Sequence, residues 1–159
     1  MKRIAEFYKV SEKQFAGEGY GEIKLPRRAT AGSAGYDFFA PCDFTLEPGS
    51  ELVIETGVRA RIAEGWFLLI LPRSGSGFKY GVRLANTAGV IDSDYFQAEN
   101  EGHIKIKLVG GNRAFCVKKG EAFAQGIFVP YGITESDDCG EARRGGFGST
   151  DENTDGKVL

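Results

Sequence analysis

Short stretches of alternating apolar and polar residues follow one another along most of this chain. In residues 104–108, Ile104, Ile106 and Leu108 alternate with two lysines, and residues 58–62 alternate three apolar residues with two arginines. Side chains two residues apart share one face of a strand, so each pattern predicts a strand with one buried face. Residues 66–71 are apolar throughout, which predicts a strand covered on both faces.

Turn signals, most of them containing glycine, separate these stretches. They lie at residues 47–50, 56–57, 64–65, 101–102, 110–112, 119–120 and 131–132. Many short strands at this spacing favour a β-sandwich or a β-barrel. The first twenty residues carry at most a weak helical pattern, and no amphipathic helix of ten or more residues is visible. The sequence therefore predicts an all-β fold with at most one short helix.

The length and the change in composition near the C-terminus indicate one domain followed by an arm. The chain has 159 residues, close to the ~150 typical of one domain. From about residue 135 the apolar periodicity ends and Gly, Ser, Asp and Arg dominate. We therefore expect a β domain over residues 23–134 and a flexible C-terminal arm over 135–159. Residues 1–22 form an N-terminal extension that can be part of the domain.

Composition and charge exclude several classes of protein. With 42% hydrophobic and 26% charged residues, the chain is not disordered as a whole. A net charge of −2 argues against non-specific nucleic-acid binding, but a few local cations could still hold a small anion. No apolar run is long enough to span a bilayer, and the N-terminus lacks the apolar core of a signal peptide, so we expect a cytoplasmic protein without membrane contact.

The cysteines and the single histidine point away from thiol or zinc chemistry. The 3 cysteines, at positions 42, 116 and 139, are widely spaced, and His103 is the only histidine. We therefore predict three reduced thiols, two of them in strands, and no zinc site. A Ser-His-Asp or Cys-His arrangement would depend on His103 alone.

Residues 72–81, with the sequence PRSGSGFKYG, form the first candidate for an anion site. They follow a predicted strand and contain two cations, two hydroxyls and three glycines. Glycines let backbone N–H groups approach a ligand closely, and consecutive N–H groups can bind an anion. The stretch matches neither a Walker A loop nor a Rossmann fingerprint. Taken alone, it also fits a plain glycine-rich turn.

Residues 86–95 and the C-terminal arm hold two further candidates. The stretch from Gly89 to Asp92 reads as a strand that begins after a turn, which would place Asp92 and Asp94 on one face. They could serve as a base and a metal partner, or as a solvated strand end. In the arm, Phe147 lies among glycines, arginines and hydroxyls. Such an arm could close over an anionic aromatic ligand or could simply be a solubilising tail.

Taken together and in order, these segments resemble the five motifs of the trimeric dUTP pyrophosphatases (dUTPases). The matching segments are AGYD at 34–37, PRSG at 72–75, GVIDSDY at 89–95, GEAFAQ at 120–125 and GGFGST at 145–150. The leader LPRRAT at 25–30 is similar as well. Each motif alone is weak, but five in the same order over about four-fifths of the chain are specific.

The resemblance implies a fold, an assembly and an activity. The fold would be a β-barrel-like jelly roll that assembles as a homotrimer, with active sites at subunit interfaces and the arm contributed across subunits. The activity would be Mg²⁺-dependent cleavage of dUTP to dUMP and pyrophosphate, which keeps uracil out of DNA and supplies dUMP for thymidylate synthesis.

The resemblance also implies site residues, by motif. Asp92 would be the general base that activates water, and Asp37 would act on the Mg²⁺ shell through water. The uracil and deoxyribose would contact Asn86, Gly89, Val90, Ile91, Tyr95 and Phe147. The phosphates would contact Arg73, Ser74, Gly75, Gln125, Arg143, Arg144, Gly148, Ser149 and Thr150. A tight hairpin would leave no space for the methyl group of thymine, and Tyr95 would exclude a ribose hydroxyl.

Several positions depart from the family pattern. Gln97 stands where the family usually has glycine, and a longer connection, residues 96–101, precedes Gly102, which can take over the turn. Arg143 and Arg144 compete for one phosphate-binding role, and Asp151 adds a negative charge after the last motif. Two rival functions remain: a dCTP deaminase of the same fold, with or without dUTPase activity, and a non-catalytic regulatory module. The deaminases' Arg-Ser-Ser stretch and a well-placed catalytic glutamate are not found.

Overall fold

The described part of the chain folds around antiparallel β-sheets that share one apolar interior. The structure is a computed structural model that describes residues 2–140. The largest sheet has five strands in the order β2-β3-β12-β7-β9. These strands are β2 (Arg27–Arg28), β3 (Tyr36–Phe39), β12 (Ala122–Pro130), β7 (Trp66–Pro72) and β9 (Gly89–Ile91).

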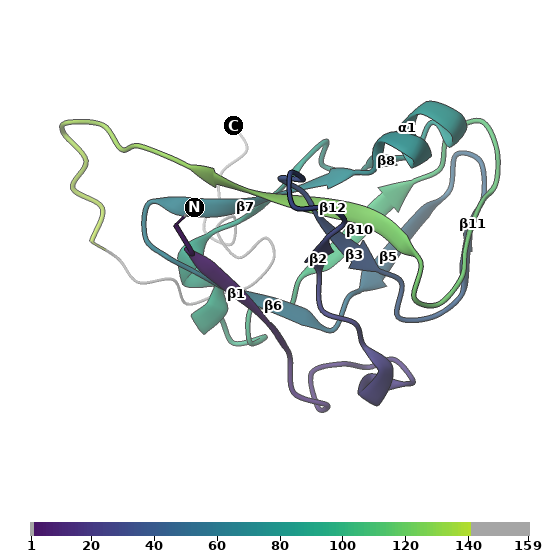
Figure 1. Cartoon of the computed structure of the whole chain (residues 1–159), viewed down its shortest axis with the longest axis horizontal. Helices are drawn as coiled ribbons and strands as arrows, with labels where there is room; N and C mark the ends of the chain where they lie inside the picture. Colours follow the sequence, from purple (N-terminus) through teal and green to yellow (C-terminus); the bar gives the residue numbers. More distant parts are fainter. Residues whose placement is uncertain (1, 141–159) are drawn as a thin grey trace, which may run out of the picture.

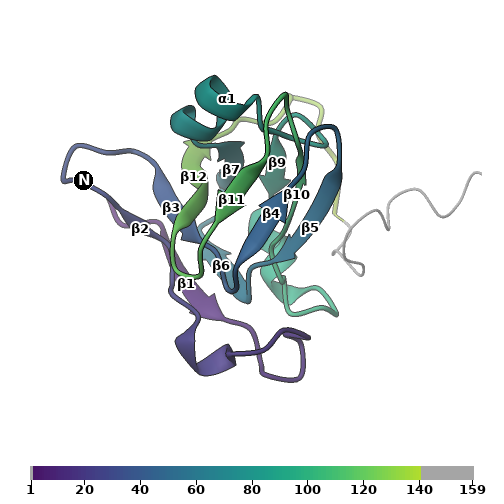
Figure 2. The ribbon, with the colours of Figure 1, turned by 90° about the vertical axis from the view of Figure 1, so that its right-hand side faces the viewer.

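Three smaller sheets complete the barrel-like arrangement. In the first, β10 (Lys105–Val109) lies between β5 (Glu51–Glu55) and β8 (Arg83–Leu84) and pairs with both. The second pairs β11 (Phe115–Val117) with β4 (Phe44–Leu46), and the third pairs β1 (Ala5–Lys9) with β6 (Val58–Ile62). Figures 1 and 2 show the helix α1 (Ser74–Tyr80) at one end of the barrel and the N-terminal segment with the 3₁₀ helix η1 (Tyr20–Glu22) at the opposite end. A second 3₁₀ helix, η2 (Ser93–Gln97), follows β9. None of the helices within residues 2–140 has the length and apolar content of a membrane span.

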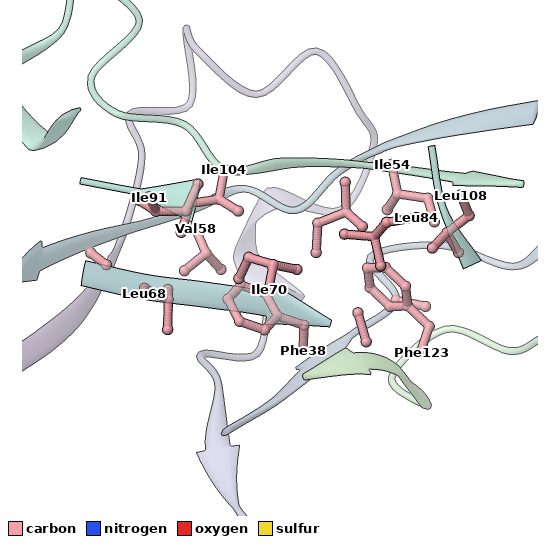
Figure 3. Packing of buried hydrophobic residues seen from close by; sticks show 14 of the residues in the cluster. Phe38, Ile54, Val58, Leu68, Ile70, Leu84, Ile91, Ile104, Leu108 and Phe123 are labelled. Carbon is pink, nitrogen blue, oxygen red and sulfur yellow. The ribbon is translucent and has the colours of Figure 1, made fainter. Parts of the chain in front are cut away.

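The alternating patterns of the sequence became strands with one buried face, as predicted. In β10, Ile106 and Leu108 are buried whereas Lys107 is exposed, and in β6 the three apolar residues are buried. Figure 3 shows side chains from β3, β5, β7, β10 and β12 meeting in the interior, with Phe38, Ile70 and Phe123 among them. Burying one such side chain contributes about 1.5–3 kcal/mol, so this interior is the main stabilising element of the fold. The predicted turns from residues 47–50 to 119–120 lie between strands, whereas residues 131–132 follow β12, after which residues 133–140 contain no further strand.

The strand at residues 66–72 differs from the prediction that both of its faces are covered. Leu68 and Ile70 are buried, but Phe67, Leu69 and Leu71 on the other face are only half-buried. In β12, which pairs with β7 along seven residues, Ile127 and Val129 are half-buried too. The apolar run was therefore predicted correctly as a strand, but residues 2–140 bury only one of its faces.

The weak helical pattern predicted for the first twenty residues was wrong for residues 5–9. They form β1, which pairs antiparallel with β6 from Ala5 opposite Ile62 to Lys9 opposite Val58. The Phe7 ring packs against the rings of Tyr36, Phe38 and Phe128 at centroid distances of 5.4–5.8 Å. These contacts come from strands far away in the sequence, so the local pattern could not reveal them.

The cysteine prediction was correct about pairing and wrong about position. All three cysteines are free and exposed. Only Cys116 lies in a strand, β11, whereas Cys42 and Cys139 lie in connections. Exposed thiols without a disulfide contribute nothing to the core.

Candidate functional site

A cluster of polar side chains forms where β3, β7 and β12 lie side by side. Asp37 and Gln125 are cross-strand neighbours, and Arg73 directly follows β7. The Arg73 Nε lies 3.0 Å from Asp37 Oδ1, and its Nη1 donates to the Ala122 carbonyl at 3.2 Å. Gln125 Nε2 donates to the Pro72 carbonyl at 3.1 Å. The sequence motifs around residues 37, 73 and 125 are thus brought together, and we call these three residues the Arg73 cluster.

The glycine-rich stretch after β7 forms a helix instead of the turn that its composition suggested. Residues Ser74–Tyr80 form α1, which begins after the extended residue Arg73 and ends at Gly81, where φ is +68°. The Ser76 hydroxyl donates to the Arg73 carbonyl at 2.8 Å and holds the first turn. The first N–H groups of a helix lack partners within it, so Ser74 and Gly75 present donors beside the Arg73 cluster.

Gly75 has open space around it. A side chain added there would meet no atom of the described residues within 4 Å, so crowding inside the chain does not require glycine. At Gly35, in contrast, a Cβ would lie 2.6 Å from Gln125 Oε1, so a side chain there would displace the Gln125 amide. The space over Gly75 lets an anion approach the helix N–H groups and the Arg73 guanidinium together.

A separate apolar pocket of about 460 Å³ lies against the hairpin of β8 and β9. Its size is within the usual range for small-molecule sites. The lining residues are Val53, Ile70, Leu84, Ala85, Asn86, Gly89, Val90, Ile91, Asn100, Lys105, Ile106 and Lys107. Four of the predicted residues, Asn86 and Gly89 to Ile91, therefore lie in one pocket.

The hairpin in this pocket is tightly turned. Thr87 N donates to the Leu84 carbonyl at 3.1 Å, and Thr87 has a positive φ of 67°, which is unfavourable for a β-branched residue. Among the strands of residues 2–140, β9 is the last of the five-stranded sheet and pairs there only with β7. Its other edge therefore leaves backbone N–H and C=O groups unpaired by a strand, next to the pocket.

Asp92 follows β9 directly, but Asp94 does not share a strand face with it, so that prediction was wrong. β9 ends at Ile91, and Asp92 precedes the 3₁₀ helix η2. The 3₁₀ turn separates the two carboxylates: Asp92 is half-buried and Asp94 is exposed. Tyr95 N donates to the Asp92 carbonyl at 3.2 Å, which fixes the start of this turn.

Tyr95 is buried, and its hydroxyl is fixed by two hydrogen bonds. The hydroxyl donates to the His103 carbonyl at 2.9 Å and accepts from Asn100 Nδ2 at 2.8 Å. Asn100, and not Tyr95, is among the residues that line the pocket. The sequence motifs did not single out Asn100, Val53, Lys105 or Lys107. The signal near Asn100 was the long connection at residues 96–101, and the two lysines belonged to the alternating pattern of residues 104–108.

The Arg73 cluster and Asp92 lie far apart in one chain. Ile91 is paired with Leu68, so Asp92 comes next to Phe67, while Arg73 follows the opposite end of β7. Six strand residues at about 3.3 Å each give a separation of about 20 Å. A single chain thus presents two half-sites, a cationic one and an apolar one with a carboxylate. The predicted arm residues Arg143, Arg144, Phe147, Gly148, Ser149 and Thr150 lie outside the described residues.

The residues of the Arg73 cluster fit a magnesium ion only as partners of its bound water molecules, not as a set of direct ligands. Within residues 2–140, no three His, Cys, Asp or Glu side chains gather into a group that could hold a metal ion. Mg²⁺ usually keeps several waters and takes one or two carboxylates together with substrate phosphates. Asp37, whose side chain is 18% exposed, offers one such carboxylate beside the Arg73 guanidinium.

His103 is a structural residue rather than a catalyst. Its side chain is completely buried, and its Nε2 accepts a hydrogen bond from Gly57 N at 2.9 Å. Burial lowers the pKa of His103 below its usual 6.5, against the opposing effect of Glu55. Within residues 2–140 this ring is enclosed and its Nε2 is occupied by Gly57 N, which favours a structural role.

We expect acidification to destabilise the fold through His103. Its pKa is lowered in the folded chain, so the unfolded chain takes up the proton first as the pH falls. The stabilising contribution is complete above pH ~6.5 and is lost as the pH drops toward the lower, folded pKa. Melting temperatures measured between about pH 7.5 and pH 5 should decline, and the decline should be weaker in His103→Gln, which keeps an acceptor but does not titrate. An equal decline in both proteins would contradict this role.

Comparison with known proteins gives a consistent match over most of the chain. A family model described as dUTPase matches residues 21–151. The deoxyuridine 5′-triphosphate nucleotidohydrolase of Ralstonia nicotianae is 44% identical over 136 residues, with 80% of this chain and 88% of the relative covered. The enzyme of the same name from Lactococcus lactis is 38% identical over 132 residues, with the same coverage of 80% and 88%. The crystal structure of a dUTPase from Streptococcus mutans is similar, with a TM-score of 0.68, 31% identity and coverage of 81% of this chain and 98% of that one.

Proposed function

This chain belongs to the dUTPase family and hydrolyses dUTP to dUMP and pyrophosphate, and we propose that it does so in sites assembled from different copies of the chain. The observation that carries the proposal is the separation of about 20 Å between Asp92 and Arg73. Cleavage at the α-phosphate needs a base for the attacking water and cations on the phosphates at the same phosphoryl group. One chain cannot bring both to it.

The apolar face of β7 and β12 supports association of several copies. Leu69, Leu71, Ile127 and Val129 are half-buried in the described chain, and burying them in a subunit interface would be favourable. The family resemblance implies a homotrimer with threefold symmetry. Three copies would then form three equivalent sites, each with one Arg73 cluster and the hairpin of a neighbour.

The pocket beside β9 would hold the uracil and the deoxyribose. The free edge of Gly89–Ile91 offers backbone donors and acceptors, which can pair with uracil O4 and N3–H. Cytosine reverses both groups and would leave buried backbone groups unpaired, which a site of this kind can reject by ~10⁴-fold. Asn86 would contribute its amide to the base, and the Tyr95 side of the pocket would exclude a 2′-hydroxyl.

The Arg73 cluster would hold the triphosphate. Arg73 would pair with phosphate oxygens, and Ser74 and Gly75 would donate backbone N–H groups, with Gln125 beside them. Asp37 would contact the hydration shell of Mg²⁺. When bound, the ion neutralises phosphate charge and orients the chain of phosphates.

Asp92 would supply the general base, and the arm would complete the site. Water is a weak nucleophile, and a carboxylate beside the α-phosphate can take its proton as attack begins. From the arm, Phe147 would stack on the uracil, either Arg143 or Arg144 would reach a phosphate, and Gly148, Ser149 and Thr150 would meet the γ-phosphate.

The proposal also concerns partners and location. It includes dUTP as the ligand, other copies of this chain as partners, and neither nucleic acid nor membrane. We place the protein in the cytoplasm, because free exposed thiols such as those of Cys42, Cys116 and Cys139 persist in reducing compartments.

A pyrophosphate-release assay against a panel of nucleotides tests this function. We expect kcat/KM for dUTP to exceed that for dCTP, dTTP and UTP by roughly 10³-fold or more, because the backbone reads the base and the pocket wall reads the sugar. Incubation with dCTP should release no ammonia. Comparable turnover of dCTP, or ammonia release, would favour a deaminase, and no pyrophosphate release at all would favour a regulatory module.

A further inference from the structure

The connection from Phe96 to Gly102 departs from the family pattern and packs directly against Tyr95. It continues from η2 and reverses before β10, and it contributes Asn100 to the wall of the apolar pocket. The motif-three segment, residues 89–95, ends at Tyr95, so this connection lies outside the five motif segments.

Asn100 makes three hydrogen bonds within this connection. Its Nδ2 donates to the Tyr95 hydroxyl at 2.8 Å, its Oδ1 accepts from Gly102 N at 3.1 Å, and its carbonyl accepts from His103 N at 3.1 Å. The Tyr95 hydroxyl uses its own hydrogen on the His103 carbonyl. The Tyr95 hydroxyl oxygen is then left as an acceptor, and the Asn100 side-chain amide donates a hydrogen bond to it.

The backbone of the connection lies in close contact with the backbone of Tyr95. Gly102 has a φ of +69°, and a Cβ at this position would lie 2.6 Å from the Tyr95 carbonyl oxygen and 2.9 Å from Phe96 Cα. Only glycine fits this position, both for its conformation and for its space. The amide of Asn100 is thereby held at a fixed place relative to the Tyr95 ring.

The outer side of the connection is anchored as well. Glu101 has a left-handed φ of 59°, which is unfavourable for a residue other than glycine. Its carboxylate accepts from Ser11 N at 2.8 Å and from the Ser11 hydroxyl at 2.6 Å, and it lies 3.8 Å from Arg59. Arg59 in turn donates to the Phe96 carbonyl at 2.6 Å and covers the Phe96 ring at 3.6 Å. A strained backbone held by this many contacts is typical of a functional position.

We propose that Asn100 is a positioning residue for Tyr95, and that the connection at residues 96–102 sets how strictly the pocket excludes a 2′-hydroxyl. This inference rests on the proposed function, in which the Tyr95 side of the pocket faces the deoxyribose. With its hydroxyl held from both sides, the buried Tyr95 ring is fixed behind Asn100, which lines the pocket. Without the Asn100 donor, this part of the pocket wall can shift and admit a ribonucleotide.

A double-mutant cycle with dUTP and UTP as substrates tests the proposal. The selectivity is kcat/KM for dUTP divided by that for UTP. We expect Asn100→Ala to lower it by about fivefold, as the loss of one neutral hydrogen bond suggests, chiefly by raising kcat/KM for UTP. Asn100→Leu, which keeps the volume of the pocket wall but cannot donate, should do the same. Glu99→Ala is the matched control in the same turn, because Glu99 is exposed, and it should leave selectivity unchanged.

The cycle separates positioning from general damage. In a Tyr95→Phe background, which lacks the hydroxyl, Asn100→Ala should change selectivity no further. Equal loss of kcat/KM for both substrates, or a full additional effect in the Tyr95→Phe background, would overturn the proposal. If Tyr95→Leu, which removes the ring, also leaves selectivity intact, then the sugar-facing role of Tyr95 in the proposed function has failed. If the Asn100 variants leave selectivity unchanged while Tyr95→Leu lowers it, the proposed function stands and the positioning role is wrong.

Discussion

Replacing Asp92 by asparagine is expected to lower kcat for dUTP by about 10³-fold, within the 10²- to 10⁴-fold range that general-base catalysis contributes. Asparagine keeps the shape of the side chain but cannot accept the proton of the attacking water. Binding of dUTP should change little, because the base and the phosphates are held by other residues. Asp94→Asn in the same turn is the matched control, since Asp94 is exposed, and it should retain activity. An Asp92→Asn enzyme with more than a tenth of the original kcat would contradict the assignment.

The same variant also tests whether sites are shared. Arg73→Ala should be nearly inactive too, because a phosphate of the substrate would lose the charge-assisted hydrogen bonds donated by the Arg73 guanidinium. If Asp92 and Arg73 of one site come from different chains, unfolding and refolding the two inactive variants together should restore part of the activity. Mixed trimers then contain sites with one intact Asp92 and one intact Arg73. No recovery, with mixed assembly verified, would mean that each chain builds its own site.

Removing residues 141–159 is expected to cost about 10²-fold or more in kcat/KM and to leave the melting temperature within a few degrees. The last strand within residues 2–140, β12, ends at Pro130, so the described core is complete without residues 141–159. The loss would include a charge-assisted hydrogen bond, worth about 1.5–3 kcal/mol, and a base–aromatic contact, worth about 1–3 kcal/mol. Melting curves and kcat/KM for dUTP check both parts.

Two outcomes of the truncation would change this view. An unchanged kcat/KM would mean that residues 141–159 serve only solubility. A collapsed melting curve would mean that they belong to the folded core. Phe147→Ala in the full chain is a useful companion, because it removes one proposed contact and leaves the length unchanged.

Strands whose burial follows their own alternation could be predicted from the sequence. In residues 58–62 and 104–108, all the apolar side chains lie on one face of the strand. The alternation therefore identifies the face that packs on the core. The glycines at 57, 65, 102 and 120 marked turns because each adopts a positive φ, which side chains disfavour.

Elements that depend on distant partners could not be predicted in this way. β1 exists because β6 pairs with it and because Phe7 meets three rings from other strands. α1 contains two glycines, which lower intrinsic helix stability, so its composition argued for a turn. Tertiary contacts decided both cases.

The candidate site was also predicted only in part, for the same reason. The motifs named Arg73, Asp37 and Gln125 separately, and strand pairing brought them together. Asn100 and Lys105 carry no motif, and their place in the pocket follows from how residues 96–102 and β10 fold back on the hairpin. The spacing of residues along the chain does not reveal contacts between segments that fold back on each other.

The order of strands in the main sheet has a consequence for protein synthesis. β3 is separated from its central partner β12 by about 80 residues of chain. At ~5–20 residues per second, a ribosome needs several seconds to make that stretch. Until β12 emerges, the inner edges of β3 and β7 lack the strand with which both of them pair. The nascent chain is therefore most exposed to aggregation late in translation, and slower, cooler expression should raise the yield of folded protein.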